Sequence, residues 1–123
     1  MPETRQVAAY YCGSDIFVCT SRLESYPRVV LEAMAYGLPI ITTPVFGIRE
    51  QVREGVNALF YEPGDWGALA KQLGVLIKEE HRRSGMAVRS ARVLALGTDF
   101  DEMVSAYEEI LAEAWLTGGE PRA

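Results

Sequence analysis

Two glutamates, Glu24 and Glu32, are the residues of this 123-residue sequence whose types and spacing best suit chemistry. Seven residues separate them, and Pro27 lies between them where the sequence predicts the start of a helix. The first N–H groups of a helix have no partner within it and can bind a phosphate. Carboxylates accept paired hydrogen bonds from neighbouring hydroxyls of a sugar or a ribose. The spacing therefore suits a ligand with a central phosphate and a hydroxyl-bearing ring on each side.

The same two glutamates also allow a plainer interpretation. Glu24 would be an acid in a surface loop, and Glu32 would be a helix-surface residue paired with Arg28, four positions earlier. For two acids taken alone, this plainer interpretation stays open.

Short apolar runs alternate with helix-forming segments along the chain. We predict strands at residues 16–20, 38–43 and 58–61. We predict helices at residues 4–12, 27–36, 48–54 and 66–78, then helical sequence from residue 79, interrupted at Gly85 and Gly97, with Thr98 capping a last helix to about residue 115. Gly13 is expected to end the first helix in the left-handed conformation.

The pattern predicts an α/β fold, a Rossmann-like parallel sheet flanked by helices. The run at residues 16–20 lacks polar alternation, which indicates an interior strand covered on both faces. Strands that alternate with helices form βαβ units with right-handed crossovers. A sheet of this kind binds its ligand at the carboxyl ends of the strands, so we expect the site in the loops after Thr20, Thr43 and Tyr61.

Charge and cysteine content exclude several classes of function. The formal net charge is -5 and no run of Lys or Arg occurs, which argues against nucleic acid and against a membrane surface as partners. No apolar run approaches the roughly 18 residues of a membrane span, so we expect no span and a cytoplasmic protein. Cys12 and Cys19 fit neither a CxxC pair nor a metal-ligand spacing, and we expect reduced thiols.

The sequence around the two glutamates resembles the group 1 family of retaining glycosyltransferases, which have the two-domain GT-B architecture. Glu24 and Glu32 match the E-x7-E motif of that family. The flanking residues agree as well: Ser21, Glu-Ser-Tyr-Pro at 24–27, Leu-Glu-Ala-Met-Ala at 31–35, Gly37, Pro39, Gly47, Glu50, and the segments 9–18, 54–60 and 63–65. The resemblance covers residues 5–80 closely and the later helices loosely.

This resemblance implies that the chain is the second half of the C-terminal, donor-binding domain of such an enzyme. Residues 1–117 would form a partial nucleotide-sugar-binding domain, and residues 118–123 a disordered tail. The implied reaction transfers a sugar from a nucleoside-diphosphate sugar with retention of configuration, without a metal or other cofactor. The nucleotide sugar would be the donor substrate.

The resemblance also implies roles for individual residues. Glu24, as the catalytic residue, would contact the sugar hydroxyls, and Glu32 would bind the ribose hydroxyls. The implied donor-binding residues are Glu24, Ser25, Tyr26, Pro27, Arg28, Val29, Val30, Glu32 and Thr43. Two departures stand out, because Pro27 removes one N–H donor and Phe46 stands where the family usually has a glycine.

Members of the family take their main phosphate-binding basic residues from earlier loops, before the segment represented here. Arg22, Arg28 and Arg49 are the nearby cations of this chain, although ordinary solvated arginines are an equal interpretation. We therefore expect the chain to be inactive alone and to need the missing upstream and acceptor parts or a partner chain. The alternative function is a non-catalytic nucleotide-sugar-binding or interaction module that acts with a partner chain. An unpaired sheet edge would also favour a homodimer.

Overall fold

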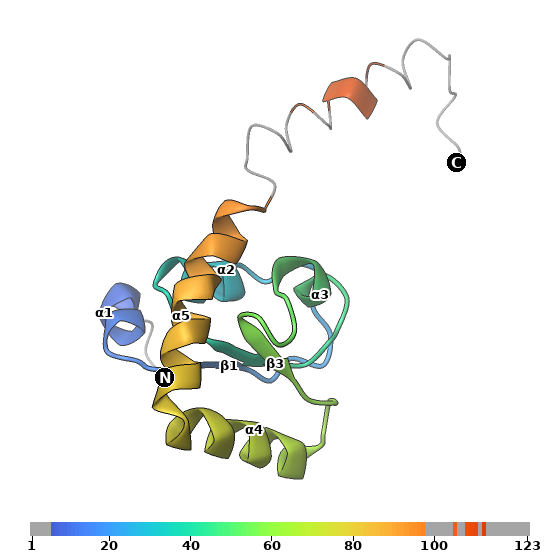
Figure 1. Cartoon of the computed structure of the whole chain (residues 1–123). Helices are drawn as coiled ribbons and strands as arrows, with labels where there is room; N and C mark the ends of the chain where they lie inside the picture. The colour runs from blue at the N-terminus through green and yellow to red at the C-terminus, as the bar shows by residue number, and fades with distance from the viewer. Residues whose placement is uncertain (1–5, 98–104, 106–107, 111, 113–123) are drawn as a thin grey trace.

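A three-stranded parallel sheet organises the chain, and helices cover both of its faces (Figure 1). In this computed structural model the described residues are 6–97, 105, 108–110 and 112. The strands are β1 (Phe17–Cys19), β2 (Ile40–Thr42) and β3 (Ala58–Phe60), in the sheet order β1-β2-β3. Both pairings are parallel. The predicted Rossmann-like α/β class is thereby confirmed.

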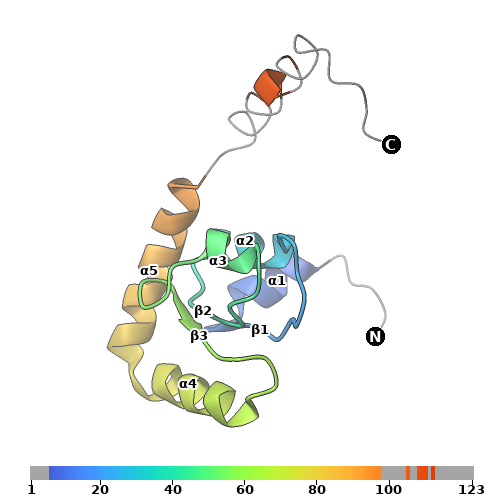
Figure 2. The same ribbon diagram turned by 90° about the vertical axis from the view of Figure 1, so that its right-hand side faces the viewer.

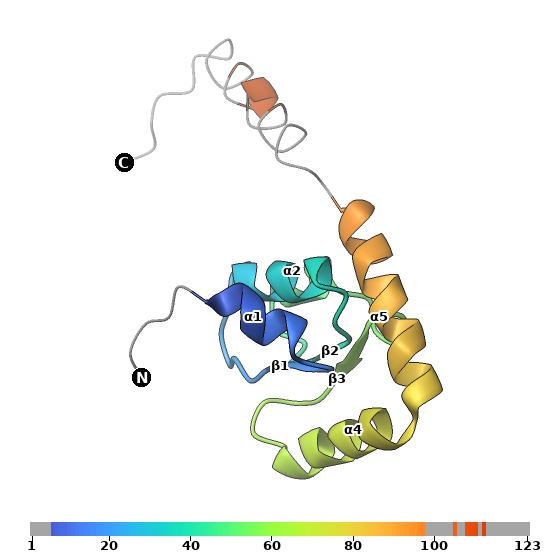
Figure 3. The same cartoon turned by 90° about the vertical axis from the view of Figure 1, so that its left-hand side faces the viewer.

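Within residues 6–97, five helices surround the sheet: α1 (Val7–Cys12), α2 (Arg28–Ala35), α3 (Ile48–Gln51), α4 (Trp66–Lys78) and α5 (Glu80–Ala95). Figures 1 and 2 show α1, α2 and α3 on one face of the sheet and α4 on the other. The long helix α5 rises from the end of α4, passes the sheet and reaches α2 (Figure 3). It therefore joins the two helical layers.

The core consists of two clusters, one on each face of the sheet. Alternate residues of a strand point to opposite faces, so Ile40 packs with Val30 and Met34 of α2, whereas Ile41 packs with Leu76 of α4. All five side chains are fully buried. Complete burial of an aliphatic side chain contributes about 1.5–3 kcal/mol, so these contacts fix how α2 lies over the sheet.

Several element boundaries differ from the sequence prediction. β1 and β2 are shorter than predicted at both ends, and β3 begins at Ala58 as predicted but ends one residue earlier. Helix α3 ends at Gln51 because Val52 is extended. Pro27 precedes α2 as its N-cap, with φ -69° and ψ 123°, so the proline lies just before the first helical turn. The proline ring fixes φ but leaves ψ free to be extended.

The conformation of Gly13, the effect of Gly85 on α5 and the position of β1 in the sheet differ from the prediction. Gly13 follows α1 with φ -89°, which is not left-handed, and Gly85 lies inside an uninterrupted α5. The predicted interior position of β1 is wrong within the described residues, since β1 pairs only with β2. A continuous apolar run indicates that both faces of a strand are covered. It does not indicate whether both edges of the strand are paired with other strands.

The predicted last helix from Thr98 to about residue 115 and the tail at 118–123 lie outside the described residues, apart from positions 105, 108–110 and 112. Within the described part of the chain, no helix is long and apolar enough to cross a membrane. Cys12 is exposed, Cys19 is buried and both are free thiols, as predicted.

Candidate functional site

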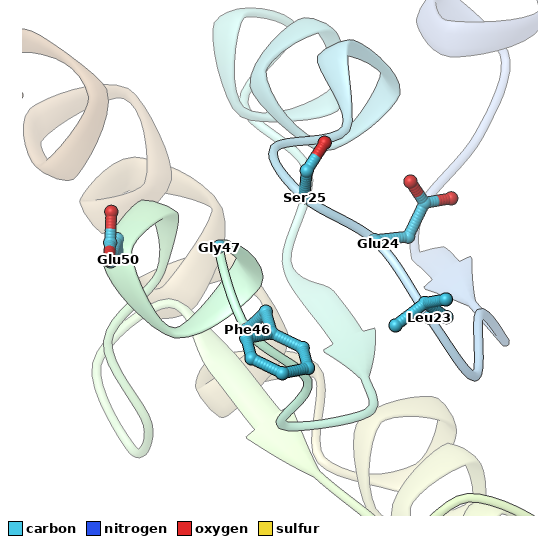
Figure 4. A pocket seen from close by; sticks show the side chains of 6 residues that line it. All are labelled: Leu23, Glu24, Ser25, Phe46, Gly47 and Glu50. Atoms are coloured by element: carbon cyan, nitrogen blue, oxygen red, sulfur yellow. The ribbon is translucent and has the colours of Figure 1, made fainter. Parts of the chain in front are cut away.

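The loops that follow β1 and β2 border an open cavity of about 760 Å³ at the carboxyl end of the sheet (Figure 4). This is the edge at which the sequence predicts the site. The residues that line the cavity are Leu23, Glu24, Ser25, Phe46, Gly47 and Glu50.

Close contacts hold the two loops together. The Thr43 hydroxyl is fully buried and donates a hydrogen bond of 2.5 Å to the carbonyl oxygen of Ser21. A Cβ atom at Gly47 would collide with the carbonyl group of Ser25. Only a glycine therefore allows this approach of the second loop to the first.

Glu24 is held by a hydroxyl from its own loop. The Ser21 Oγ donates to Glu24 Oε1 at 2.9 Å, and the carboxylate is only partly exposed. In Figure 4 the Glu24 carboxylate points away from the Phe46 ring. Because Thr43 fixes Ser21 and Ser21 fixes Glu24, the carboxylate is oriented before any ligand arrives.

The amino end of α2 offers unused backbone donors beside this loop. The Pro27 carbonyl accepts the Val30 N–H at 3.3 Å and the buried Gln51 side-chain amide at 3.0 Å. Among the described residues, no hydrogen bond uses the N–H groups of Arg28 and Val29. These two donors and the positive end of the eight-residue helix suit an anionic group.

The remaining donor-binding predictions from this loop differ in exposure. Ser25, Tyr26 and Arg28 are exposed, and Val29 is 44% exposed. The Val30 side chain is fully buried in the core, so Val30 offers a ligand only its backbone. Thr43 is likewise buried and acts on the site through Ser21.

Glu32 does not line the cavity but lies further along α2, where Tyr11 of α1 meets it. The Tyr11 hydroxyl donates to Glu32 Oε2 at 3.0 Å. Burial, reinforced by this hydrogen bond and the Glu32 charge, raises the pKa of Tyr11 to about 12. Arg28 and Glu32 form no ion pair within the described residues. The plainer interpretation, in which Glu32 pairs with Arg28 on the helix surface, is therefore wrong about that pairing.

The nearby arginines divide into two kinds. Arg49 donates to the Pro44 carbonyl at 2.7 Å, and its guanidinium lies 5.9 Å from the centre of the Phe60 ring. It therefore stabilises the second loop. Arg22 and Arg28 are exposed, and neither forms an ion pair within the described residues.

The cavity also contains four residues that were not among the predicted donor-binding residues: Leu23, Phe46, Gly47 and Glu50. Phe46 and Gly47 nevertheless belong to the loop after Thr43, which was predicted to border the site. Phe46 has a φ of 27°, which is strained for any residue with a side chain, and it is 75% exposed. Leu23 directly precedes Glu24 in the first loop, and its apolar side chain gave no signal of a binding role.

A family model described as "Glycosyl transferases group 1" matches residues 2–92 of the chain. The chain belongs to the group 1 glycosyltransferase family. The resemblance drawn from the E-x7-E motif is confirmed. The chain is 32% identical, over 112 residues, to a D-inositol 3-phosphate glycosyltransferase of Xylanimonas cellulosilytica. It is 36% identical, over 104 residues, to an N-acetyl-alpha-D-glucosaminyl L-malate synthase of Bacillus anthracis.

These matches cover 91% and 85% of this chain but only 27% of each relative. Among solved structures, HepE of Anabaena in complex with UDP-glucose superposes with a TM-score of 0.80 at 23% identity, over 92% of this chain and 31% of that one. The C-terminal domain of LpcC, a group 1 glycosyltransferase of Francisella tularensis, gives a TM-score of 0.69 at 25% identity, over 77% and 49%. The chain thus has the fold of part of a C-terminal glycosyltransferase domain.

Proposed function

We propose that the chain forms part of the donor site of an enzyme that transfers a sugar from a nucleoside-diphosphate sugar with retention of configuration. The observation that carries this proposal is the arrangement at the amino end of α2. A pre-oriented Glu24 precedes the free N–H groups of Arg28 and Val29, and Glu32 follows them along the same helix. Support also comes from the names of two relatives, a D-inositol 3-phosphate glycosyltransferase and an N-acetyl-alpha-D-glucosaminyl L-malate synthase, and from the UDP-glucose bound to HepE.

Each group has a distinct task in this proposal. The diphosphate lies at the amino end of α2, near the exposed Arg28 side chain, where the helix dipole favours negative charge. Glu24 accepts hydrogen bonds from the sugar hydroxyls, and Glu32 accepts them from the ribose. Ser25 and Tyr26 border the sugar and the diphosphate, and Pro27 fixes the direction in which α2 begins.

The proposed reaction breaks the bond between the anomeric carbon and the oxygen of the distal phosphate. The anomeric carbon forms a new bond to the oxygen of an acceptor hydroxyl, and the proton of that hydroxyl passes to the departing diphosphate. Positive charge develops on the sugar ring and negative charge on the departing diphosphate. The N–H groups of α2 and the Arg28 guanidinium stabilise that departing charge, while the Glu24 carboxylate holds the ring. In this proposal basic groups take the place of a metal ion at the diphosphate.

We further propose that the chain alone does not catalyse transfer. It spans 27% of the relatives it matches, and β1 has a sheet partner on one side only within the described residues. An upstream segment, an acceptor domain or a partner chain would cover that edge. The same exposed edge supports the alternative of a non-catalytic nucleotide-sugar-binding module that acts with a partner chain. It also keeps a homodimer as a prediction, which a measurement of the mass in solution at two protein concentrations tests.

A calorimetric titration tests the donor site. The purified chain is titrated with UDP, GDP, ADP and their common sugar conjugates, and the titration is repeated with Glu32→Gln. Loss of one charge-assisted hydrogen bond should weaken binding about tenfold or more. The matched control is Glu54→Gln, because Glu54 is exposed and precedes β3 at the opposite end of the sheet. Equal weakening by both variants would contradict the proposed site.

A chimera separates the two proposed functions. The chain replaces the matching part of the Bacillus anthracis synthase, and circular dichroism first confirms that the product folds. If the chimera transfers sugar and Glu24→Gln abolishes that transfer, the result supports the proposed enzymatic function. A folded chimera that binds nucleotide without turnover supports the binding module.

A further inference from the structure

The Tyr11 hydroxyl contacts the carboxylate of Glu32 across 21 residues of sequence. Tyr11 belongs to α1 and Glu32 to α2, and their Oη–Oε2 distance is 3.0 Å. Of the hydrogen bonds between described side chains, this is the one that reaches the Glu32 carboxylate. The second carboxylate oxygen, Oε1, accepts none within the same residues.

The ring of Tyr11 is itself held on two sides. It stacks on Tyr36 at the end of α2, with ring centres 5.2 Å apart and planes at 12°. It also lies 6.1 Å from the ring of Phe17 in β1, tilted by 39°. Offset aromatic pairs at these distances are favourable, so the two ring contacts hold Tyr11 and its hydroxyl in place.

The hydroxyl acts as a donor at every pH at which proteins normally work. Burial and the Glu32 carboxylate raise the pKa of Tyr11 to about 12, so the phenol keeps its proton. By donating its proton, the neutral phenol of Tyr11 fixes the orientation of the Glu32 carboxylate. Oε2 of Glu32 is then held by the protein, and Oε1 is available to a ligand.

We propose that Tyr11 is a positioning residue, which orients the Glu32 carboxylate so that Oε1 accepts a hydrogen bond from a ribose hydroxyl of the bound nucleotide. This inference rests on the proposed function, which assigns Glu32 to the ribose. A purely structural Tyr11 would instead join α1 to α2 and would have no preference among ligands.

Ligand pairs that differ only in the ribose distinguish these roles. The chain and its Tyr11→Phe variant, which keeps the ring stacking, are titrated with the nucleoside diphosphate that binds best and with its 2′,3′-dideoxy analogue. We expect Tyr11→Phe to weaken the ribonucleotide about tenfold and to leave the dideoxy analogue within about twofold. Tyr10→Phe is the matched control, because Tyr10 is the neighbouring residue of α1 and is 68% exposed. Equal losses for both ligands, or no loss for either, would overturn the positioning role.

A second measurement separates this inference from the proposed function. If the unmodified chain binds no nucleotide, the proposed function fails for the isolated chain, and the Tyr11 hydroxyl is titrated by NMR with ring-labelled tyrosine. In Glu32→Gln the pKa of Tyr11 should fall from about 12 toward 10.0, because the neighbouring charge is gone. An unchanged pKa would show that the hydroxyl does not engage Glu32, and the inference would be wrong.

Discussion

The two ends of the sheet are built in opposite ways. At the amino ends of the strands, α5 closes the structure with buried hydrogen bonds. Ser90 donates to the Leu38 carbonyl at 2.6 Å, and the Asn57 amide lies 3.4 Å from the Ser90 hydroxyl. The Asn57 side-chain oxygen accepts the Arg53 N–H at 2.8 Å. Ser90 and Asn57 are both fully buried.

The carboxyl end leaves several groups without partners. Leu23 and Phe46 are 77% and 75% exposed at the cavity, and no described residue accepts the N–H groups of Arg28 and Val29 at the start of α2. Buried polar groups are costly unless paired, so the closed end contributes to stability. Unpaired groups beside a cavity stay hydrated until a ligand replaces the water. The comparison assigns stability to one end and binding to the other.

The largest expected effect comes from Gly47→Ala, at the point where the site loops touch. The added Cβ would meet the Ser25 backbone, so the loops must separate. We expect the free energy of unfolding to fall by about 3 kcal/mol, at the upper end of typical overpacking costs. Chemical denaturation measures this loss.

Gly74→Ala is the control for that substitution. Gly74 lies within α4, and a Cβ there would have no heavy atom within 4 Å. Since alanine favours a helix, this variant should gain up to about 1 kcal/mol. Similar changes in the two variants would contradict the close loop contact.

At the closed end, Asn57→Ala should cost about 2 kcal/mol of unfolding free energy, because it leaves the Arg53 N–H without its acceptor. Nucleotide affinity, measured by calorimetry, should stay unchanged in the folded variant. A large loss of affinity would show that the two ends of the sheet are coupled.

The sequence predicted the fold better than it predicted the contacts. Aspartate favours the position before a helix, and the Asp65 carboxylate accepts the Ala68 N–H at 2.9 Å at the start of α4. Glycine favours the position after a helix, and Gly37, which follows the helix predicted at residues 27–36, has a φ of 68°. Both are local effects, governed by one turn of backbone. The edge position of β1 was missed, because periodicity describes the faces of a strand and not its neighbours.

The site was predicted in part for the same reason. Glu24 and Ser25 both line the cavity, since one motif in one loop carries them, and their role toward a donor stays a prediction. Phe46 lies in the loop after β2 and Glu50 lies in α3, and only the folded sheet brings them close to Glu24. Tyr11 could not have been paired with Glu32 from the sequence, because the contact depends on how α1 and α2 pack.

Alkaline pH should weaken the contact between Tyr11 of α1 and Glu32 of α2. The resulting loss of stability should be smaller than that caused by Gly47→Ala or Asn57→Ala. The pKa of Tyr11 is raised by burial and by Glu32 from 10.0 to about 12, and burial also raises the pKa of Tyr61. The folded chain therefore holds these protons more tightly than the unfolded chain. Their stabilising contribution is complete below pH 10 and is lost as the pH rises toward 12. Solvent screening at the partly exposed Tyr11 keeps the effect modest.

Denaturation midpoints recorded between pH 9 and pH 12 measure this loss. Tyr11→Phe should flatten the decline and leave the part due to Tyr61, whereas Tyr10→Phe should follow the unmodified chain. A decline of the same steepness in Tyr11→Phe would exclude Tyr11 as its source.

The smallest expected effect concerns the strained residue of the open end. Phe46 has a φ of 27°, a conformation that glycine adopts freely and that costs other residues about 1–2 kcal/mol. Glycine also gains entropy in the unfolded chain, worth about 0.5–1 kcal/mol, so Phe46→Gly should raise stability by only about 0.5 kcal/mol. Phe46→Ala removes the same exposed ring but keeps a Cβ, and it should give no gain. If strain at this position serves the ligand, nucleotide affinity should fall in Phe46→Gly while stability rises, as expected where stability and function conflict. A rise in both would place the strain outside the site's function and would narrow the difference between the two ends of the sheet.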